Sequence, residues 1–173
     1  MARIIAADDS LIVQKSYLQM LELLGHEAVI CTNGKLALEA FRENPAELVI
    51  LDVDMPEMDG FAACREIRKL PEGANIPIIM VSVEDSEENI LNGMNAGAND
   101  YLIKPVKEQH LIAKLKNFLK YATVHKTDLD LVRNHDQIAG RYEIEKLLGY
   151  GAHSVVFLGN DKEDGKRVAI KLI

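Results

Sequence analysis

The sequence predicts a doubly wound α/β domain followed by a short antiparallel β meander. Short apolar segments alternate with amphipathic segments through residues 1–122, a pattern typical of successive strands and helices. Two apolar runs, within residues 47–52 and 76–82, are nearly continuous, as expected for parallel strands covered on both faces. From residue 140 the apolar runs follow one another without intervening helices. We therefore expect a five-stranded parallel sheet first and a separate β segment in residues 140–173.

The elements of the first domain follow in chain order. The five strand candidates read RIIAA, EAVIC, ELVILD, IPIIMVS and DYLIK. Two of the intervening helices have an apolar face built at spacings of three and four residues. The apolar face of the first helix contains Val13, Tyr17, Leu21 and Leu24, and that of the fifth contains Leu111, Leu115, Phe118 and Leu119. Consecutive βα units of this kind predict right-handed crossovers.

Composition restricts the classes of partner. The formal net charge is −7, and all of the acidic excess lies in residues 1–122. No basic stripe is present to neutralise phosphates, so we expect no direct binding to nucleic acid. No apolar run approaches the ~20 residues of a membrane span, and no export signal opens the chain. With Cys31 and Cys64 as its two cysteines, the chain is expected to be a reduced, cytoplasmic protein without membrane contact.

Polar side chains follow four of the five predicted strands. Asp8 and Asp9 end the first strand, Asp52 the third, Ser82 the fourth and Lys104 the fifth. In open α/β sheets, ligands bind outside the carboxyl ends of the strands. Each residue has an ordinary alternative role, such as a helix cap for Asp9. Their joint presence at strand ends predicts one site.

The residue types at these strand ends predict a phosphoryl-transfer site. Three carboxylates in one crevice stay ionised only if a cation joins them, and oxygen ligands suit Mg²⁺ or Mn²⁺. One carboxylate could then attack phosphorus and form an aspartyl phosphate. Lys104 would neutralise charge on the phosphoryl oxygens, and the Ser82 hydroxyl could donate to another of them.

Four segments resemble the receiver domain of two-component response regulators. They are ADDS, VILDVDMPEMDG, IMVS and AGANDYLIKPV, and the resemblance covers roughly residues 2–122. It implies a flavodoxin-like fold with strand order 2-1-3-4-5. It also implies that Asp52 accepts a phosphoryl group from a histidine kinase or phosphotransfer protein.

The resemblance further assigns roles to individual residues. It implies that Mg²⁺ is bound by Asp8, Asp9, Asp52 and the backbone carbonyl of Asp54. Ser82 and Lys104 would contact the phosphoryl group.

A conformational switch is also part of the resemblance. Tyr101 matches the aromatic switch position, and the Lys104–Pro105 peptide bond is expected to be cis. Tyr101 has a simpler alternative role as an aromatic side chain that packs on the sheet edge. Phosphorylation would draw Ser82 inward and free space for Tyr101.

Two other function classes fit part of the pattern. VILDVDM also fits the start of haloacid-dehalogenase-like phosphatases, which use an aspartyl phosphate with Asp52 as nucleophile. Against this, the Asp8–Asp9 pair precedes the nucleophile, and Pro56 stands where that family has Thr or Val. A receiver that serves only as a docking module is disfavoured because every reactive position is filled.

Residues 140–173 resemble the beginning of a Ser/Thr protein kinase domain. Gly149, Gly151 and Val156 match G-x-G-x-x-G-x-V, with Ser154 in place of the third glycine, and Lys171 lies in VAIK. The resemblance implies a glycine-rich loop over ATP phosphates and a lysine on the α/β-phosphates.

The later kinase motifs are absent from residues 140–173. They contain neither H-R-D nor D-F-G, so we expect no protein kinase activity from this chain and ATP binding only in a complete parent kinase. The chain is thus interpreted as the amino-terminal piece of a receiver–kinase.

Residues 123–139 are expected to form a partly helical linker. Apolar residues recur at heptad spacing from Leu111 to Val132, and a continuous helix there would favour a homodimer. Thr127 to Asp130 instead look like a new helix start, and His125 interrupts the seam. We favour two helices separated by a break over one continuous helix.

Overall fold

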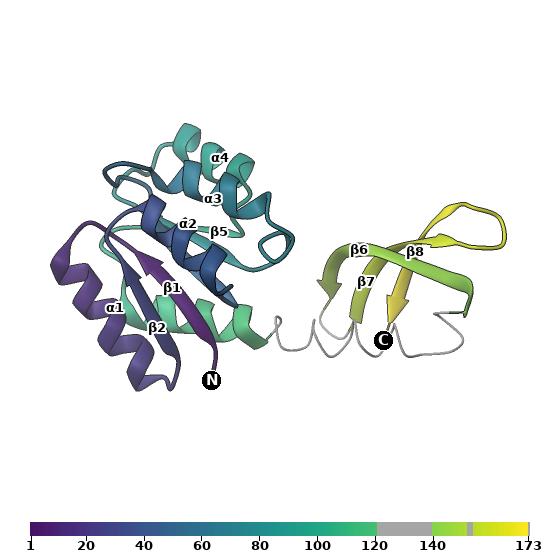
Figure 1. Ribbon diagram of the computed structural model, residues 1–173, viewed down its shortest axis with the longest axis horizontal. Helices are drawn as coiled ribbons and strands as arrows, with labels where there is room; N and C mark the ends of the chain where they lie inside the picture. The colour runs from purple at the N-terminus through teal and green to yellow at the C-terminus, as the bar shows by residue number, and fades with distance from the viewer. Residues whose placement is uncertain (121–139, 152–153, 173) are drawn as a thin grey trace. The chain divides into compact units, whose positions relative to one another are not determined.

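The computed structural model describes residues 1–120, 140–151 and 154–172 (Figure 1). The chain divides into two compact units, Met1–Ala122 and Thr123–Ile173. No described helix is both long enough and apolar enough to cross a bilayer. The linker predicted for residues 123–139, with both alternatives for its helices, lies outside the described residues.

The first unit is built on a five-stranded parallel sheet. Its strands are β1 (Arg3–Ala7), β2 (Glu27–Cys31), β3 (Leu48–Asp52), β4 (Ile78–Ser82) and β5 (Asp100–Ile103). Their order is β2-β1-β3-β4-β5, and every neighbouring pair is parallel. The predicted fold class and strand order are confirmed.

Helices connect the strands. They are α1 (Leu11–Leu23), α2 (Gly34–Glu43), α3 (Gly60–Arg68) and α4 (Glu87–Ala96), and residues 108–120 are also helical. Side-chain oxygens of Asn33, Asp59 and Ser86 cap α2, α3 and α4 by accepting backbone N–H groups of the first turn. Gly97 ends α4 with φ of 103°, a left-handed conformation that favours glycine. Local sequence thus sets where these helices begin and end.

Helices cover both faces of the parallel sheet (Figure 1), and alternating strand residues face the two core layers beneath them. In β1, Ile4 and Ala6 pack with α1 and the helix of residues 108–120. Ile5 and Ala7 face the other side and pack with α2, α3 and α4. The apolar faces predicted for the first and fifth helices are confirmed, because all their members pack in the first of these layers. A sheet covered on both faces leaves its carboxyl edge as the place for polar residues.

The second unit contains a three-stranded antiparallel sheet. Its strands β6 (Tyr142–Gly151), β7 (Ser154–Asp161) and β8 (Arg167–Leu172) lie in chain order. The Gly165 backbone has φ of 70° in the turn between β7 and β8, a left-handed conformation that favours glycine in hairpin turns. The predicted meander is confirmed.

Candidate functional site

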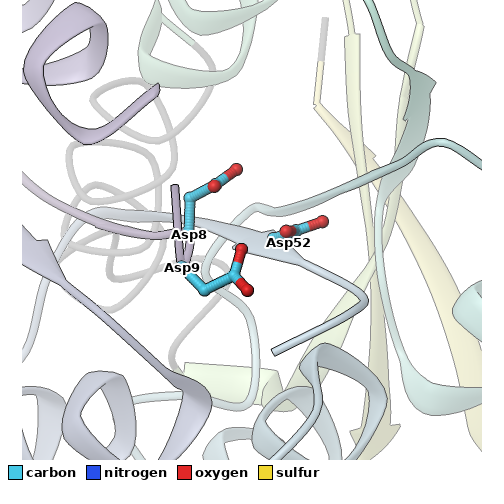
Figure 2. A group of neighbouring side chains, drawn as sticks. All are labelled: Asp8, Asp9 and Asp52. Atoms are coloured by element: carbon cyan, nitrogen blue, oxygen red, sulfur yellow. The ribbon is translucent and has the colours of Figure 1, made fainter. Parts of the chain in front are cut away.

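Three aspartates gather at the carboxyl edge of the parallel sheet (Figure 2). Asp8 and Asp9 follow β1, and Asp52 ends the neighbouring strand β3. One carboxylate oxygen from each lies within 4.8 Å of those of the other two. Asp8 and Asp52 are buried and Asp9 is exposed, so the cluster opens to solvent on one side. The structure therefore brings together three of the residues that the strand-end argument grouped.

Lys104 joins the two buried carboxylates. Its Nζ lies 2.8 Å from Asp8 Oδ2 and 2.9 Å from Asp52 Oδ2. The Lys104–Pro105 peptide bond is cis, as the resemblance implied. One cation thus offsets part of the charge of three carboxylates, and the cluster keeps a net negative charge.

The pKa values reflect burial and this charge. Burial is the main cause that raises the pKa of Asp52; Asp8 and Asp9 act in the same direction, and the hydrogen bond from Lys104 opposes them. Burial opposes the charge on Lys104, but its hydrogen bonds to Asp8 and Asp52 outweigh this and raise the Lys104 pKa. Burial and the charges of Asp8 and Asp52 also raise the pKa of Tyr17. A second cation would be favoured in such surroundings.

The start of α1 holds Asp8 in place, which the sequence pattern did not reveal. The Ser10 backbone N–H donates to Asp8 Oδ1 at 2.8 Å, and the Gln14 side-chain amide donates to the Asp8 carbonyl at 2.8 Å. Ser10 is the N-cap residue of α1, so Asp9 is not the cap. In the sequence, the contact of Gln14 with Asp8 could have been inferred only from a polar side chain one helical turn after the Asp8–Asp9 pair.

The loop after β3 passes close to the phosphoacceptor candidate. A Cβ on Gly60 would lie only 2.2 Å from the Asp52 carbonyl oxygen, so α3 begins against the Asp52 backbone at a distance that only glycine allows. The exposed side chain of Asp54 is not part of the carboxylate cluster. The role suggested for its backbone carbonyl stays a prediction.

Ser82 and Tyr101 are linked through the backbone of one residue, Glu84. Ser82 Oγ accepts a hydrogen bond from the Glu84 backbone N–H at 3.0 Å, and the Tyr101 hydroxyl donates to the Glu84 carbonyl at 3.2 Å. The Tyr101 ring lies over Gly93 of α4, where an added Cβ would be 2.9 Å from ring carbon Cδ2. Glu84 was missed in the sequence because it acts through backbone atoms.

Residues of the predicted ATP site lie in the second sheet. Gly149 in β6 pairs with Val156 in β7, and Val156 pairs with Lys171 in β8. Gly151 pairs with Ser154 at the end of the first hairpin. The backbone register therefore brings a glycine, the valine and the lysine of the motif side by side.

Comparison with protein families identifies the first unit. The family described as response regulator receiver domain matches residues 4–116. The chain belongs to this family. Among curated relatives, the probable transcriptional regulator ycf27 of Porphyra purpurea is 33% identical over 127 residues, which cover 73% of this chain and 51% of that protein. The response regulator MprA of Mycolicibacterium vanbaalenii is 33% identical over 121 residues, or 70% of this chain and 52% of the relative.

Solved structures agree with the family assignment. The chemotaxis protein CheY4 of Vibrio cholerae has a TM-score of 0.66 and 30% identity, covering 68% of this chain and 98% of that chain. The receiver domain of the sensor histidine kinase PA1611 of Pseudomonas aeruginosa, solved with a magnesium ion in its active-site cleft, has a TM-score of 0.65 and 28% identity. That match covers 69% of this chain and 98% of the PA1611 domain.

The comparisons cover one part of the whole protein. The chain spans about half the length of the curated relatives it matches, and the family match ends at residue 116. The relatives named above are a probable transcriptional regulator and a response regulator. The receiver of a two-component response regulator is therefore the established part of this chain.

Proposed function

We propose that Asp52 is the phosphoacceptor of this receiver. The observation that carries the proposal is the buried Asp52 carboxylate, bonded to Lys104 and grouped with two further aspartates. A carboxylate oxygen of Asp52 attacks the phosphorus of a phosphohistidine on a donor protein, and a P–O bond forms. The P–N bond breaks, and the imidazole nitrogen keeps its electron pair. Lys104 favours the ionised form of Asp52 before transfer, against the effect of burial, and stabilises the added phosphoryl charge afterwards.

The proposed cofactor is Mg²⁺, held by Asp8, Asp9 and Asp52. Carboxylate oxygens in an open, partly solvated cluster match the ligand preference of this ion, which keeps several waters. The magnesium-containing PA1611 receiver supports the same choice. When bound, the ion would screen repulsion between the carboxylates and the incoming phosphoryl oxygens. The Asp54 carbonyl is the proposed backbone ligand.

The proposed output runs through Ser82 and Tyr101. A phosphoryl group on Asp52 offers new acceptor oxygens to the Ser82 hydroxyl. Because Ser82 Oγ and the Tyr101 hydroxyl both bond backbone atoms of Glu84, movement of Ser82 would be passed to Tyr101. The surface of α4 and β5 would then change between two states.

Intact-protein mass spectrometry with acetyl phosphate tests this function. With Mg²⁺ present we expect one phosphoryl group on the wild-type protein and none on Asp52→Asn. Removal of Mg²⁺ with a chelator should abolish the reaction. Ser82→Ala should retain partial acceptance, because its hydroxyl only donates to the product. Equal labelling of Asp52→Asn would refute the proposal, and turnover of many phosphomonoesters would favour the phosphatase alternative.

We further propose that residues 140–173 begin a Ser/Thr protein kinase domain regulated by the receiver. Support comes from the antiparallel β6–β8 sheet and from the register of Gly149, Val156 and Lys171. In a complete kinase, Lys171 would contact the α/β-phosphates of ATP. The relatives that are transcriptional regulators share the receiver part, so they do not bear on this second segment.

Calorimetry and kinase assays test the kinase proposal. Residues 1–173 should show negligible ATP binding, since binding energy would be needed to order the site. In a chain that carries the full kinase domain, Lys171→Met should abolish transfer to serine or threonine. Asp52→Asn should alter regulation but leave basal transfer intact. Undiminished kinase activity in Lys171→Met would contradict the assignment.

A further inference from the structure

Asn33 connects two loops at the carboxyl edge of the parallel sheet. It lies between β2 and α2 and is only 3% exposed. Its Oδ1 accepts the Leu36 backbone N–H at 2.8 Å and so caps α2. Its Nδ2 donates to Glu57 Oε1 at 3.0 Å, in the loop between Asp52 and α3. Both ends of one buried amide are therefore used, one for a helix and one for the loop that follows the phosphoacceptor.

The loop segment that receives this bond has a constrained backbone. Glu57 has φ of 64°, a left-handed conformation that side chains with a Cβ rarely adopt. Such a conformation persists where surrounding contacts hold it. The next residue, Met58, accepts a backbone bond from Gly34 N–H at 3.0 Å, and a Cβ on Gly34 would lie 2.5 Å from that carbonyl oxygen. The two loops are thus in direct backbone contact beside the Asn33 bond.

The surface ion pair at the same position is the weaker contact. Lys35 Nζ lies 4.0 Å from Glu57 Oε2, and both side chains are more than half exposed. Exposed ion pairs of this kind contribute little to the stability of the fold because solvent screens the two charges. The Asn33 amide is buried, so if Glu57 is lost as its acceptor, no water can take the place of Glu57. The Asn33–Glu57 bond is therefore the contact that fixes the side chain of Glu57.

We propose that Asn33 is a positioning residue for the phosphoacceptor loop of this receiver. By holding Glu57 it fixes residues 53–58, the segment that joins Asp52 to α3 and includes Asp54. The conformation of this segment would set how well the cluster of Asp8, Asp9 and Asp52 takes a divalent cation. The proposal rests on the proposed function of Asp52. It adds a residue that was not among those predicted from the strand ends.

Three variants distinguish the positioning role of Asn33 from its role as the cap of α2 and from changes in charge. Asn33→Asp keeps the cap oxygen for Leu36 but places two acceptors face to face at Glu57. Asn33→Asp combined with Glu57→Gln restores a donor–acceptor pair with the donor on the other side, and its net charge equals that of the wild type. Lys35→Gln removes only the exposed ion pair.

Two measurements are made on each variant in the full chain. The first is Mg²⁺ affinity by calorimetry, and the second is amide hydrogen exchange of residues 53–58 and of α2 without metal. We expect Asn33→Asp to bind Mg²⁺ about tenfold more weakly, the low end for residues behind metal ligands. Exchange in residues 53–58 should be faster while α2 is unchanged. The double variant should recover both values, and Lys35→Gln should match the wild type.

The results distinguish this proposal from the proposed function. The negative charge that Asn33→Asp adds would by itself strengthen cation binding, so weaker binding supports loss of positioning. Wild-type affinity and wild-type exchange in Asn33→Asp would overturn the proposal, and so would a double variant as weak as Asn33→Asp. If the wild-type protein bound no Mg²⁺, the metal site would fail, whereas the exchange data would still decide whether Asn33 holds the loop.

Discussion

At the residue scale, the charge that Asp52 needs for its proposed chemistry destabilises the folded protein. The carboxylate is buried at the carboxyl end of β3, and burial raises its pKa above the usual range. Lys104 offsets part of this cost through its bonds to Asp52 and Asp8. The ionised form that the proposed attack on phosphorus requires thus lies in a site that, relative to water, favours the neutral form.

Asp52→Asn is expected to stabilise the metal-free protein at neutral pH. The folded-state pKa of Asp52 is raised, so the favourable contribution of its neutral form is present below the unfolded-state pKa and is lost as pH rises through the folded-state pKa. An amide keeps the shape and carries no charge. We expect a gain of about 1 kcal/mol in the free energy of unfolding, a typical size for a single substitution.

Thermal unfolding across pH checks this expectation. The advantage of Asp52→Asn should shrink as pH falls and Asp52 becomes protonated in the wild type. Added Mg²⁺ should stabilise the wild-type protein more than the variant. A variant less stable than the wild type at neutral pH, without metal, would show that the Lys104 bond outweighs the burial cost.

Site residues were predictable from the sequence where a side chain itself ends a strand. Asp8, Asp9, Asp52 and Lys104 follow parallel strands, and parallel strands bring their carboxyl ends together. Other contacts depend on loop conformation, which has no simple periodic signal. This second class contains the Glu84 backbone between Ser82 and Tyr101, the Gln14 amide on Asp8 and the Asn33–Glu57 bond.

At the element scale, α4 and β5 meet closely at a glycine. Gly93 is buried in α4, and the Tyr101 ring of β5 occupies the space where a side chain would stand. This contact keeps the Tyr101 hydroxyl within reach of the Glu84 carbonyl. The position of the aromatic ring therefore depends on a small residue in the facing helix.

Gly93→Ala should displace the Tyr101 ring with little change in stability. Replacement of a helical glycine by alanine gains roughly 1 kcal/mol in helix propensity. Crowding against the ring, 2.9 Å away, costs about the same or more. We expect a net change within about 1 kcal/mol together with loss of the Tyr101–Glu84 bond.

NMR of the Tyr101 ring, followed with thermal unfolding, checks this prediction. Asn92→Ala is the matched control, because it changes an exposed neighbour in the same helix. The ring signals should move in Gly93→Ala and stay in Asn92→Ala. Unmoved signals in Gly93→Ala would mean that α4 shifts as a whole and that Gly93 does not set the ring position.

At the scale of the whole molecule, the sequence predicted two separate sheets for a physical reason. Alternation of strands and helices in residues 1–122 requires parallel pairing, whereas consecutive strands from residue 140 permit a meander. The order of the parallel strands is not encoded locally, and it followed from the family resemblance. The linker of residues 123–139 combined two helical patterns, which explains why periodicity alone left its interpretation open.

Residues 1–122 should retain the receiver's properties on their own. The carboxylate cluster, Lys104, Ser82 and Tyr101 all lie in the first compact unit. We expect this fragment to melt within a few degrees of the corresponding transition in residues 1–173 and to take a phosphoryl group at a similar rate. Calorimetric scans and acetyl phosphate labelling of both chains measure this. A fragment that unfolds at room temperature would show that residues 123–173 are part of its core.

Chemical trapping of the phosphorylated residue tests the central claim most directly. The protein is incubated with Mg²⁺ and acetyl phosphate, reduced with borohydride, and digested for peptide sequencing by mass spectrometry. Because an acyl phosphate is reduced to an alcohol, we predict homoserine at position 52 and unmodified aspartate at positions 8, 9 and 54. Homoserine at any of those three positions, with aspartate intact at 52, would contradict the assignment of Asp52 as the phosphoacceptor.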